Sequence, residues 1–260
     1  MHLFRALALC LIAAAPAAAQ LGNPNAQGVA LGHIHLNSAD PDAAIKFWTD
    51  VIGASTYSHE SLKGVSTQGV IILFTRKAST GPSAGTAIDH LGLTVPDIQP
   101  FVEKVAKSGY RSFQPLPGGD KLMVDGPDGV RIELIEDNAM YTTLDFDHID
   151  FHSTQPKEMQ AWYAKTFGAR SIPGETSDSS KISGVSLTFE HADSAAPSAG
   201  RAIDHIGFEV KGLEAFCKKL TDNGIKLDSP YRSLPDLKLS IAFLTDPWGT
   251  RIELTEGLAH

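Results

Sequence analysis

The sequence predicts an α+β fold made of four copies of one unit, in which a strand is followed by a helix and then by about three strands. An internal repeat is the first observation behind this prediction, because Pro-Ser-Ala-Gly-Thr-Ala-Ile-Asp-His-Leu-Gly at 82–92 returns with two changes at 197–207. A shorter period is the second, because an alternating strand followed by a helix of about ten residues occurs four times. Each half of the chain therefore contains two related units.

The first 19 residues have the pattern of a secretory signal peptide. Arg5 precedes an apolar run, and Ala17, Ala18 and Ala19 supply the small residues of a cleavage site. The run is shorter than the roughly 20 apolar residues that a membrane-spanning helix needs. We therefore expect an exported protein, periplasmic or secreted, with no membrane partner.

In the first unit, an alternating strand is expected at 32–36, and the helix after it has a clear beginning and end. Asp40 is a good N-cap, Pro41 suits the first helical turn, and Gly53 favours the left-handed backbone that ends a helix. The apolar face of this helix consists of residues spaced three and four apart, namely Ala44, Phe47, Trp48 and Val51. Short runs of alternating or β-branched residues, such as 70–75, predict the strands that complete the unit.

The other three units follow the same order. Their first strands are expected at 88–95, 146–151 and 203–210. Their helices end at glycines equivalent to Gly53, namely Gly109, Gly168 and Gly224. The boundary between the halves falls near 138–144, so the sequence predicts two domains, at 29–140 and 141–258, after the signal peptide at 1–19.

The composition excludes some partners. The chain has 22 Lys and Arg residues against 30 Asp and Glu residues, and it has no cluster of basic side chains. Such an acidic protein is a poor partner for nucleic acid or for an anionic membrane, so a small-molecule partner is expected. Cleavage of the signal peptide leaves Cys217 as the only cysteine, which allows no internal disulfide.

Histidines recur at equivalent positions of the two halves. His33 and His148 lie in the first strands of the halves, and His90 and His205 follow each of them by the same 57 residues. Alternate side chains of a strand share a face, and related units can bring two such strands together. We therefore expect His33 to face His90, and His148 to face His205.

A glutamate near the end of the last strand completes each set. Glu133 and Glu253 stand between apolar neighbours, where a buried carboxylate is costly without a cation. The expected metal ligands are therefore His33, His90 and Glu133 in one half, and His148, His205 and Glu253 in the other. Two imidazoles and one carboxylate leave positions open for substrate and for oxygen or water, a set typical of Fe(II) and also used by Mn(II), with Zn(II) as a further alternative. The competing interpretation is that the histidines are ordinary core residues and that each glutamate pairs with Arg131 or Arg251.

The chain resembles the vicinal oxygen chelate (VOC) superfamily, which includes glyoxalases, extradiol ring-cleaving dioxygenases, fosfomycin-modifying enzymes and bleomycin-binding proteins. The resemblance is carried by Gly-His-Ile-His-Leu at 32–36, Ile-Asp-His at 88–90 and 203–205, Phe-Asp-His-Ile-Asp-Phe at 146–151, Gly-Pro-Asp-Gly-Val-Arg-Ile-Glu at 126–133 and Asp-Pro-Trp-Gly-Thr-Arg-Ile-Glu at 246–253. It implies four βαβββ units paired into two glyoxalase-like domains, with metal ligands at the six positions given above.

The resemblance also bears on the reaction. Glyoxalase I and related epimerases have a fourth protein ligand, at positions where this chain has Leu73 and Thr188, so the open site of an extradiol dioxygenase is favoured. His191 lies near the place where those enzymes carry a histidine that handles the substrate proton, and it is the candidate catalytic residue. Two departures weaken the match, because Phe243 stands where those enzymes have a tyrosine and Leu234 where they have a further histidine.

The leading hypothesis is an exported, metal-dependent enzyme that binds a small aromatic diol or enediol through neighbouring oxygens and oxidises or cleaves it. The residues expected to contact the substrate or to line its pocket are Asp150, His35, Phe243 and Tyr231. The alternatives are a glyoxalase-like lyase or isomerase, a fosfomycin-type transferase, and a non-enzymatic binding protein of the bleomycin-resistance type. A homodimer is left open.

Overall fold

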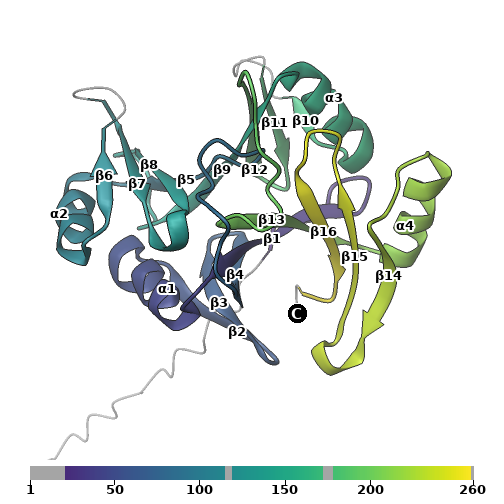
Figure 1. The fold of residues 1–260 in the computed structure, drawn as a ribbon, viewed down its shortest axis with the longest axis horizontal. Coiled ribbons are helices and arrows are strands. Elements are labelled where there is room, and N and C mark those ends of the chain that lie inside the picture. Colours follow the sequence, from purple (N-terminus) through teal and green to yellow (C-terminus); the bar gives the residue numbers. More distant parts are fainter. Residues whose placement is uncertain (1–20, 115–118, 172–177, 259–260) are drawn as a thin grey trace, which may run out of the picture.

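Two eight-stranded mixed sheets form the protein (Figure 1). The computed structural model describes residues 21–114, 119–171 and 178–258, so the signal peptide expected at 1–19 lies outside the described residues. The first sheet has the order β14-β15-β16-β13-β1-β4-β3-β2 and the second the order β10-β11-β12-β9-β5-β8-β7-β6. The predicted α+β fold of four βαβββ units is confirmed.

The strands of the first sheet are β1 (Val29–Ser38), β2 (Ser55–His59), β3 (Leu62–Thr67), β4 (Val70–Arg76), β13 (Ile203–Val210), β14 (Ser229–Leu234), β15 (Leu239–Thr245) and β16 (Arg251–Glu256). Those of the second are β5 (His90–Val95), β6 (Arg111–Phe113), β7 (Lys121–Asp125), β8 (Arg131–Glu136), β9 (Asp145–Ser153), β10 (Arg170–Ser171), β11 (Ser179–Ile182) and β12 (Val185–His191). The α-helices are α1 (Pro41–Phe47), α2 (Gln99–Ser108), α3 (Pro156–Phe167) and α4 (Leu213–Asp222).

The way in which the units pair differs from the expectation. In the first sheet β1 runs antiparallel to β13, which joins the first unit to the fourth, and in the second sheet β5 runs antiparallel to β9, which joins the second unit to the third. Figure 1 shows β1 beside β13 although they lie at opposite ends of the chain. Each sheet therefore takes strands from both predicted domains, and the boundary near residue 140 does not separate the sheets.

Chain connectivity explains this pairing. The short segment between β8 and β9 lets the third unit pair with the second, its neighbour along the chain, as consecutive elements usually do. The first strands of the first and fourth units are then the two that are left to pair with each other. An internal repeat identifies units that are alike, but it does not say which of four similar strands will share hydrogen bonds.

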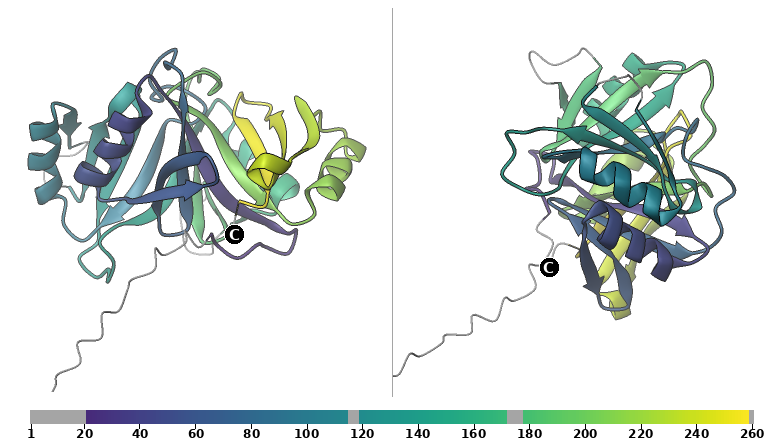
Figure 2. Two further views of the ribbon diagram at one scale, coloured as in Figure 1. Left: turned by 90° about the horizontal axis from the view of Figure 1, so that it is seen from below. Right: turned by 90° about the vertical axis from the view of Figure 1, so that its left-hand side faces the viewer.

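The first helix illustrates how local sequence and core packing agree. The Asp40 side chain accepts a hydrogen bond from the Ala43 backbone N–H at 3.3 Å, and Gly53 ends the helical segment with φ of 92°. Between them the chain continues from α1 into a π-helical turn at Trp48–Ile52, where the Trp48 side chain is fully buried. One continuous hydrophobic core takes side chains from both sheets and from all four α-helices. In the left view of Figure 2, helices flank the strands at both ends of the molecule.

None of the helices within residues 21–114, 119–171 and 178–258 is long and apolar enough to cross a membrane.

Candidate metal centre

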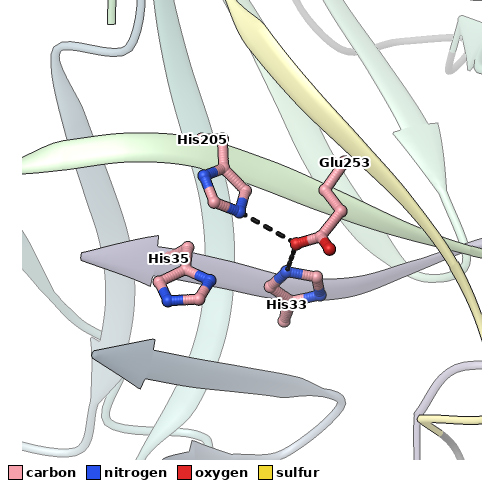
Figure 3. A group of neighbouring side chains, drawn as sticks. All are labelled: His33, His35, His205 and Glu253. Carbon is pink, nitrogen blue, oxygen red and sulfur yellow. Dashed lines mark hydrogen bonds and ion pairs between the residues drawn. The ribbon is translucent and has the colours of Figure 1, made fainter. Parts of the chain in front are cut away.

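The contact between β1 and β13 brings together residues that are 172 positions apart in the chain. In this antiparallel pair His33 lies opposite Gly207, and His35 lies opposite His205. Because His33 and His35 are two residues apart on one strand, their side chains share a face of the sheet with His205. Figure 3 shows these three imidazoles and the Glu253 carboxylate converging on one space. We call His33, His35, His205 and Glu253 the first site.

The first site is centred on one carboxylate oxygen. His33 Nε2 and His205 Nε2 each lie 3.0 Å from the same Oε2 atom of Glu253, one from β1 and the other from β13. His33 is 1% exposed, His205 5% and Glu253 8%, so the three groups meet away from water. The predicted pairing of His33 with His90 is therefore wrong, and His33 belongs with His205 and Glu253.

A glycine makes room for this arrangement. A Cβ atom added at Gly207 would overlap the imidazole ring of His33, which lies flat against the β13 backbone at that point. Any other residue at position 207 would push the ring away from Glu253. The glycine that follows two residues after the Ile-Asp-His motif thus has a direct role in holding the site.

Asp204 fixes the orientation of His205. The His205 Nδ1–H donates to Asp204 Oδ1 at 2.7 Å, which leaves Nε2 directed at Glu253. Asp204 itself accepts hydrogen bonds from the Arg251 guanidinium at 2.7 Å and from the Gly200 backbone N–H at 2.7 Å. Such carboxylate–imidazole pairs behind a ligand set its tautomer and raise its affinity for metal.

The electrostatics of the first site follow from burial opposed by close pairing. Burial by itself raises the pKa of Glu253, but the hydrogen bonds and positive charges of His205 and His33 outweigh it and hold that pKa well below its usual range. Burial by itself lowers the pKa of His205, and the carboxylates of Asp204 and Glu253 together raise it above the ordinary value. The site thus stabilises an anionic carboxylate next to cationic groups.

His35 stands at the edge of the site as a neutral imidazole. Burial, together with repulsion from His205 and His33, holds the pKa of His35 well below its ordinary value. Its Nε2 lies 2.7 Å from Thr75 Oγ1, while its Nδ1 is buried with no hydrogen-bond partner among the described residues. The His35 ring centre is 4.6 Å from that of His205. An unpaired nitrogen at this place is suited to a cation.

The donor set fits a divalent metal ion. Each of the four residues offers one ligand atom, and these atoms all lie within 4.8 Å of one another. Imidazole and carboxylate donors together suit Fe(II), Mn(II) and Zn(II). The residues of the first site could therefore hold a metal that replaces the protons on the two Nε2 atoms.

Substitution of the residue behind His205 should weaken metal binding without removing a ligand. We expect Asp204→Asn to lower the affinity of the first site for divalent metal by about 10- to 100-fold, because the amide holds the imidazole less firmly and carries no charge. A titration against a competing chelator measures this. The matched control is Asp89→Asn, since Asp89 Oδ1 lies 3.1 Å from His90 Nδ1 in the other sheet. An equal loss in both variants would contradict the assignment.

The equivalent place in the second sheet carries His90, His148, Glu133 and Asp150, which we call the second site. The contact between β5 and β9 sets Gly92 opposite His148, and the His148 ring occupies the space that a Cβ at Gly92 would need. His90 Nε2 and His148 Nε2 lie 3.3 Å apart. The expected partnership of His148 with His205 is thus wrong, because His148 belongs with His90 and Glu133.

The second site is less closely gathered than the first. His90 Nε2 lies 3.9 Å and His148 Nε2 3.6 Å from Glu133 Oε2. Lys121 Nζ lies 3.0 Å from the other oxygen of Glu133. Asp150 pairs with His152 Nε2 at 2.9 Å and accepts a hydrogen bond from Thr188 Oγ1 at 2.7 Å.

Clefts lie beside both sites. His35, Leu73 and Phe74 line a cleft of about 330 Å³ next to the first site. A cleft of about 370 Å³ at the second site is lined by charged and polar groups that include Glu133 and Asp150. Both volumes suit a small molecule.

Of three residues predicted to act on or contact a substrate, two lie away from the first site and one lies beside it. His191 ends β12 in the second sheet, with an exposed side chain whose Nε2 lies 3.6 Å from Asp193, so its expected role beside His205 is wrong. Tyr231 packs against the hydrophobic core, and its hydroxyl lies 3.2 Å from Ser240 Oγ, so it does not line the site. Phe243 pairs with Glu253 across β15 and β16, and its ring centre lies 5.5 Å from that of His205, so it does stand beside the first site.

Some contributing residues were not foreseen from the sequence. Asp204 and Asp147 directly precede the ligand candidates His205 and His148, so the repeated Asp-His pair carried a usable signal. Lys121 has no such signal, because its distance from Glu133 along the chain says nothing about the face that it shares with that residue.

Comparison with known proteins supports the fold independently. The sequence model of the Glyoxalase/Bleomycin resistance protein/Dioxygenase superfamily matches residues 30–134 and 145–254. A probable lactoylglutathione lyase from Vibrio parahaemolyticus is 30% identical over 130 residues, which cover 44% of this chain and 94% of that protein.

Two solved structures share the overall arrangement. Glyoxalase I from Zea mays superimposes with a TM-score of 0.63 at 17% identity, covering 88% of this chain and 92% of that chain. A candidate dioxygenase from Bacillus subtilis superimposes with a TM-score of 0.62 at 15% identity, covering 93% of this chain and 88% of that chain. At this level of identity the two structures show the fold alone.

Proposed function

The chain belongs to the Glyoxalase/Bleomycin resistance protein/Dioxygenase superfamily, and from this premise we propose that it is a divalent-metal-dependent enzyme acting on a small substrate through two adjacent oxygens. The observation that carries the proposal is the convergence of His33 Nε2 and His205 Nε2, each at 3.0 Å, on one buried oxygen of Glu253. When bound, a divalent ion supplies Lewis acidity that stabilises negative charge on a substrate oxygen. The surrounding residues exclude water and fix the ligand orientations.

We propose further that His35 supplies a fourth donor, through Nδ1. Leu73 was expected to leave the site with three protein donors, but Leu73 pairs with His35 across β4 and β1, and His35 presents its unpaired nitrogen to the same space. With four protein donors, the residues of the first site would leave fewer coordination positions open to substrate and dioxygen than a three-donor site would. This arrangement favours a redox-neutral lyase or isomerase of the glyoxalase type.

His35→Ala tests the fourth donor by means that do not depend on turnover. With Co(II) as the probe, we expect the variant to retain one ion with an affinity at least about 10-fold lower and with a changed visible absorption spectrum, because one nitrogen donor has been lost. Asp150→Ala is the matched control, since Asp150 occupies the equivalent place opposite His90. An unchanged spectrum in His35→Ala would show that His35 is not a ligand.

A second candidate is the oxygen-dependent oxidation or cleavage of a small aromatic diol or enediol. It is favoured by the two imidazoles and one carboxylate of His33, His205 and Glu253 taken alone, which is a set used by Fe(II) oxygenases. In that case His35 contacts the substrate, as predicted from the sequence. Fe(II) would then be preferred over Mn(II) and Zn(II).

One set of assays separates these candidates. Protein loaded anaerobically with Fe(II), Mn(II) or Zn(II) would be analysed for metal content and then supplied with an α-oxoaldehyde and glutathione, or with catechols in an oxygen electrode. Metal-dependent turnover without oxygen uptake supports the lyase or isomerase. Oxygen uptake with catechols would instead support the second candidate, the oxygen-dependent enzyme. Ligand binding that survives chelation, with no metal retained, would instead identify a binding protein.

We also propose that the protein is exported and processed before Gln20, because Arg5, the apolar run and the Ala17–Ala19 site form a signal peptide. Cell fractionation and N-terminal sequencing of the mature protein test this. A full-length protein retained in the cytoplasm would contradict it. The homodimer stays a prediction, which size-exclusion chromatography can test.

A further inference from the structure

We propose that Lys121 fills the cation position of the second site, so that the protein carries one divalent ion, at the first site, and not two. The inference rests on the proposed function in taking the first site as a metal centre. It goes beyond the proposed function by assigning to one residue the different charge balance of two sites that each set two histidines beside a glutamate.

The Lys121 ammonium contacts both oxygens of the Glu133 carboxylate. Nζ lies 3.0 Å from Oε1 and 3.1 Å from Oε2, so the negative charge of this ligand candidate is already paired. Glu133 is 6% exposed, whereas the Lys121 side chain is 46% exposed, so the ammonium reaches the buried carboxylate from the solvent side. A divalent ion entering here must displace the ammonium from Glu133 or accept a positive charge beside it.

The histidines of the second site stand back from Glu133. Their Nε2 atoms lie 3.9 Å and 3.6 Å from Glu133 Oε2, whereas both equivalent distances in the first site are 3.0 Å. The carboxylate thus turns toward the lysine and away from the imidazoles. The two sites differ in where their glutamate points, although each of them sets two imidazoles beside one glutamate.

Sheet register identifies the residue that replaces Lys121 in the first site. Glu133 pairs with Met123 across β7 and β8, and Lys121 stands two residues before Met123. Glu253 pairs with Phe243 across β15 and β16, and Ile241 stands two residues before Phe243. Lys121 and Ile241 are therefore equivalent, and Ile241 is buried and carries no charge. Glu253 consequently pairs with the imidazoles alone.

The fourth position of the second site is also engaged. Asp150, the equivalent of His35, forms an ion pair with His152 and accepts a hydrogen bond from Thr188. His35 keeps an unpaired buried nitrogen in the first site. In the second site, then, Glu133 lies against Lys121 and Asp150 lies against His152, although Asp150 Oδ1, like His35 Nδ1, is buried without a hydrogen bond among the described residues.

The test is to make the second site resemble the first. Wild-type protein, Lys121→Ile and the charge-retaining control Lys121→Arg would be stripped with a chelator and titrated with Co(II), with metal content measured after desalting. After desalting, we expect one bound ion in wild type and in Lys121→Arg, and two in Lys121→Ile. In the titration, the second site of Lys121→Ile should bind Co(II) at least about 10-fold more tightly than the second site of wild type does. Adding Glu133→Gln to Lys121→Ile should remove the gained ion.

The outcomes separate the inference from the proposed function. Two ions of similar affinity in wild type, or one ion in a folded Lys121→Ile variant, would overturn the inference and leave the first site intact. No ion in wild type would overturn the proposed metal centre, and a single ion gained in Lys121→Ile would then still support the role of Lys121. Thermal unfolding followed by circular dichroism confirms that each variant is folded, and Lys107→Ala controls for the loss of a surface charge on α2.

Discussion

Glu253→Gln should abolish metal binding at the first site, whereas Glu133→Gln should leave the metal content of the protein unchanged. The amide keeps the size of the side chain but removes the negative charge on which His33 and His205 converge. The loss of affinity should exceed the roughly 10- to 100-fold that removal of an outer partner causes, because Glu253 is itself a ligand. Metal-dependent turnover should fall to the level of metal-free protein.

The paired variants make this prediction specific. Each glutamate is the third residue of a strand that begins Arg-Ile-Glu, and both are buried, so loss of folding alone would affect the two variants alike. Elemental analysis after loading and desalting distinguishes them. Since His33 and His205 belong to one site, His33→Ala and His205→Ala should lose the same ion. Loss of metal in Glu133→Gln with retention in Glu253→Gln would reverse the assignment of the working site.

Gly207→Ala should both destabilise the fold and release the metal. The added methyl group would overlap the His33 ring, and the buried ring can yield only by leaving its place beside Glu253. Overpacking of this kind typically costs about 1–3 kcal/mol of unfolding free energy. We expect a lower midpoint in denaturant unfolding, together with an affinity for metal reduced by more than about 100-fold, because one ligand is displaced.

A second substitution separates the steric effect from the loss of the ligand. His33→Ala removes the ring, so the double variant His33→Ala/Gly207→Ala should recover much of the stability that Gly207→Ala loses but should not regain metal. Gly92→Ala is the matched control in the other sheet, where the methyl group would meet the His148 ring. It should be destabilised in the same way while keeping its single ion. Full metal binding by Gly207→Ala would show that the ring is not held as described.

Much of the fold follows from local sequence. Asp40 and Gly53 bracket the first helical segment as their capping chemistry predicts, and the alternating residues of 32–36 and 203–210 lie in strands. The repeat located the four units, and the family resemblance named their βαβββ order, which the superfamily match supports. These features depend on contacts between residues close together in the chain, so the sequence displays them directly.

Which residues gather in each site was much harder to predict from the sequence. The four histidines all stood in equivalent strands, so the sequence did not say which two of them share a site; they are His33, His90, His148 and His205. His191 was expected near His205 but lies in the other sheet, because its distance from His205 along the chain does not determine which strands pair. The role of Lys121 depends on the register between β7 and β8, to which no motif points.

By itself, the sequence determined that the protein contains four related units and that imidazoles and carboxylates recur in their first and last strands. Only the tertiary structure decided that the first unit pairs with the fourth, that His33 therefore meets His205 and Glu253, and that Lys121 lies against Glu133. The reason is physical: helix caps and strand alternation are set by neighbours along the chain, whereas pairing between strand edges depends on how the whole chain closes on itself.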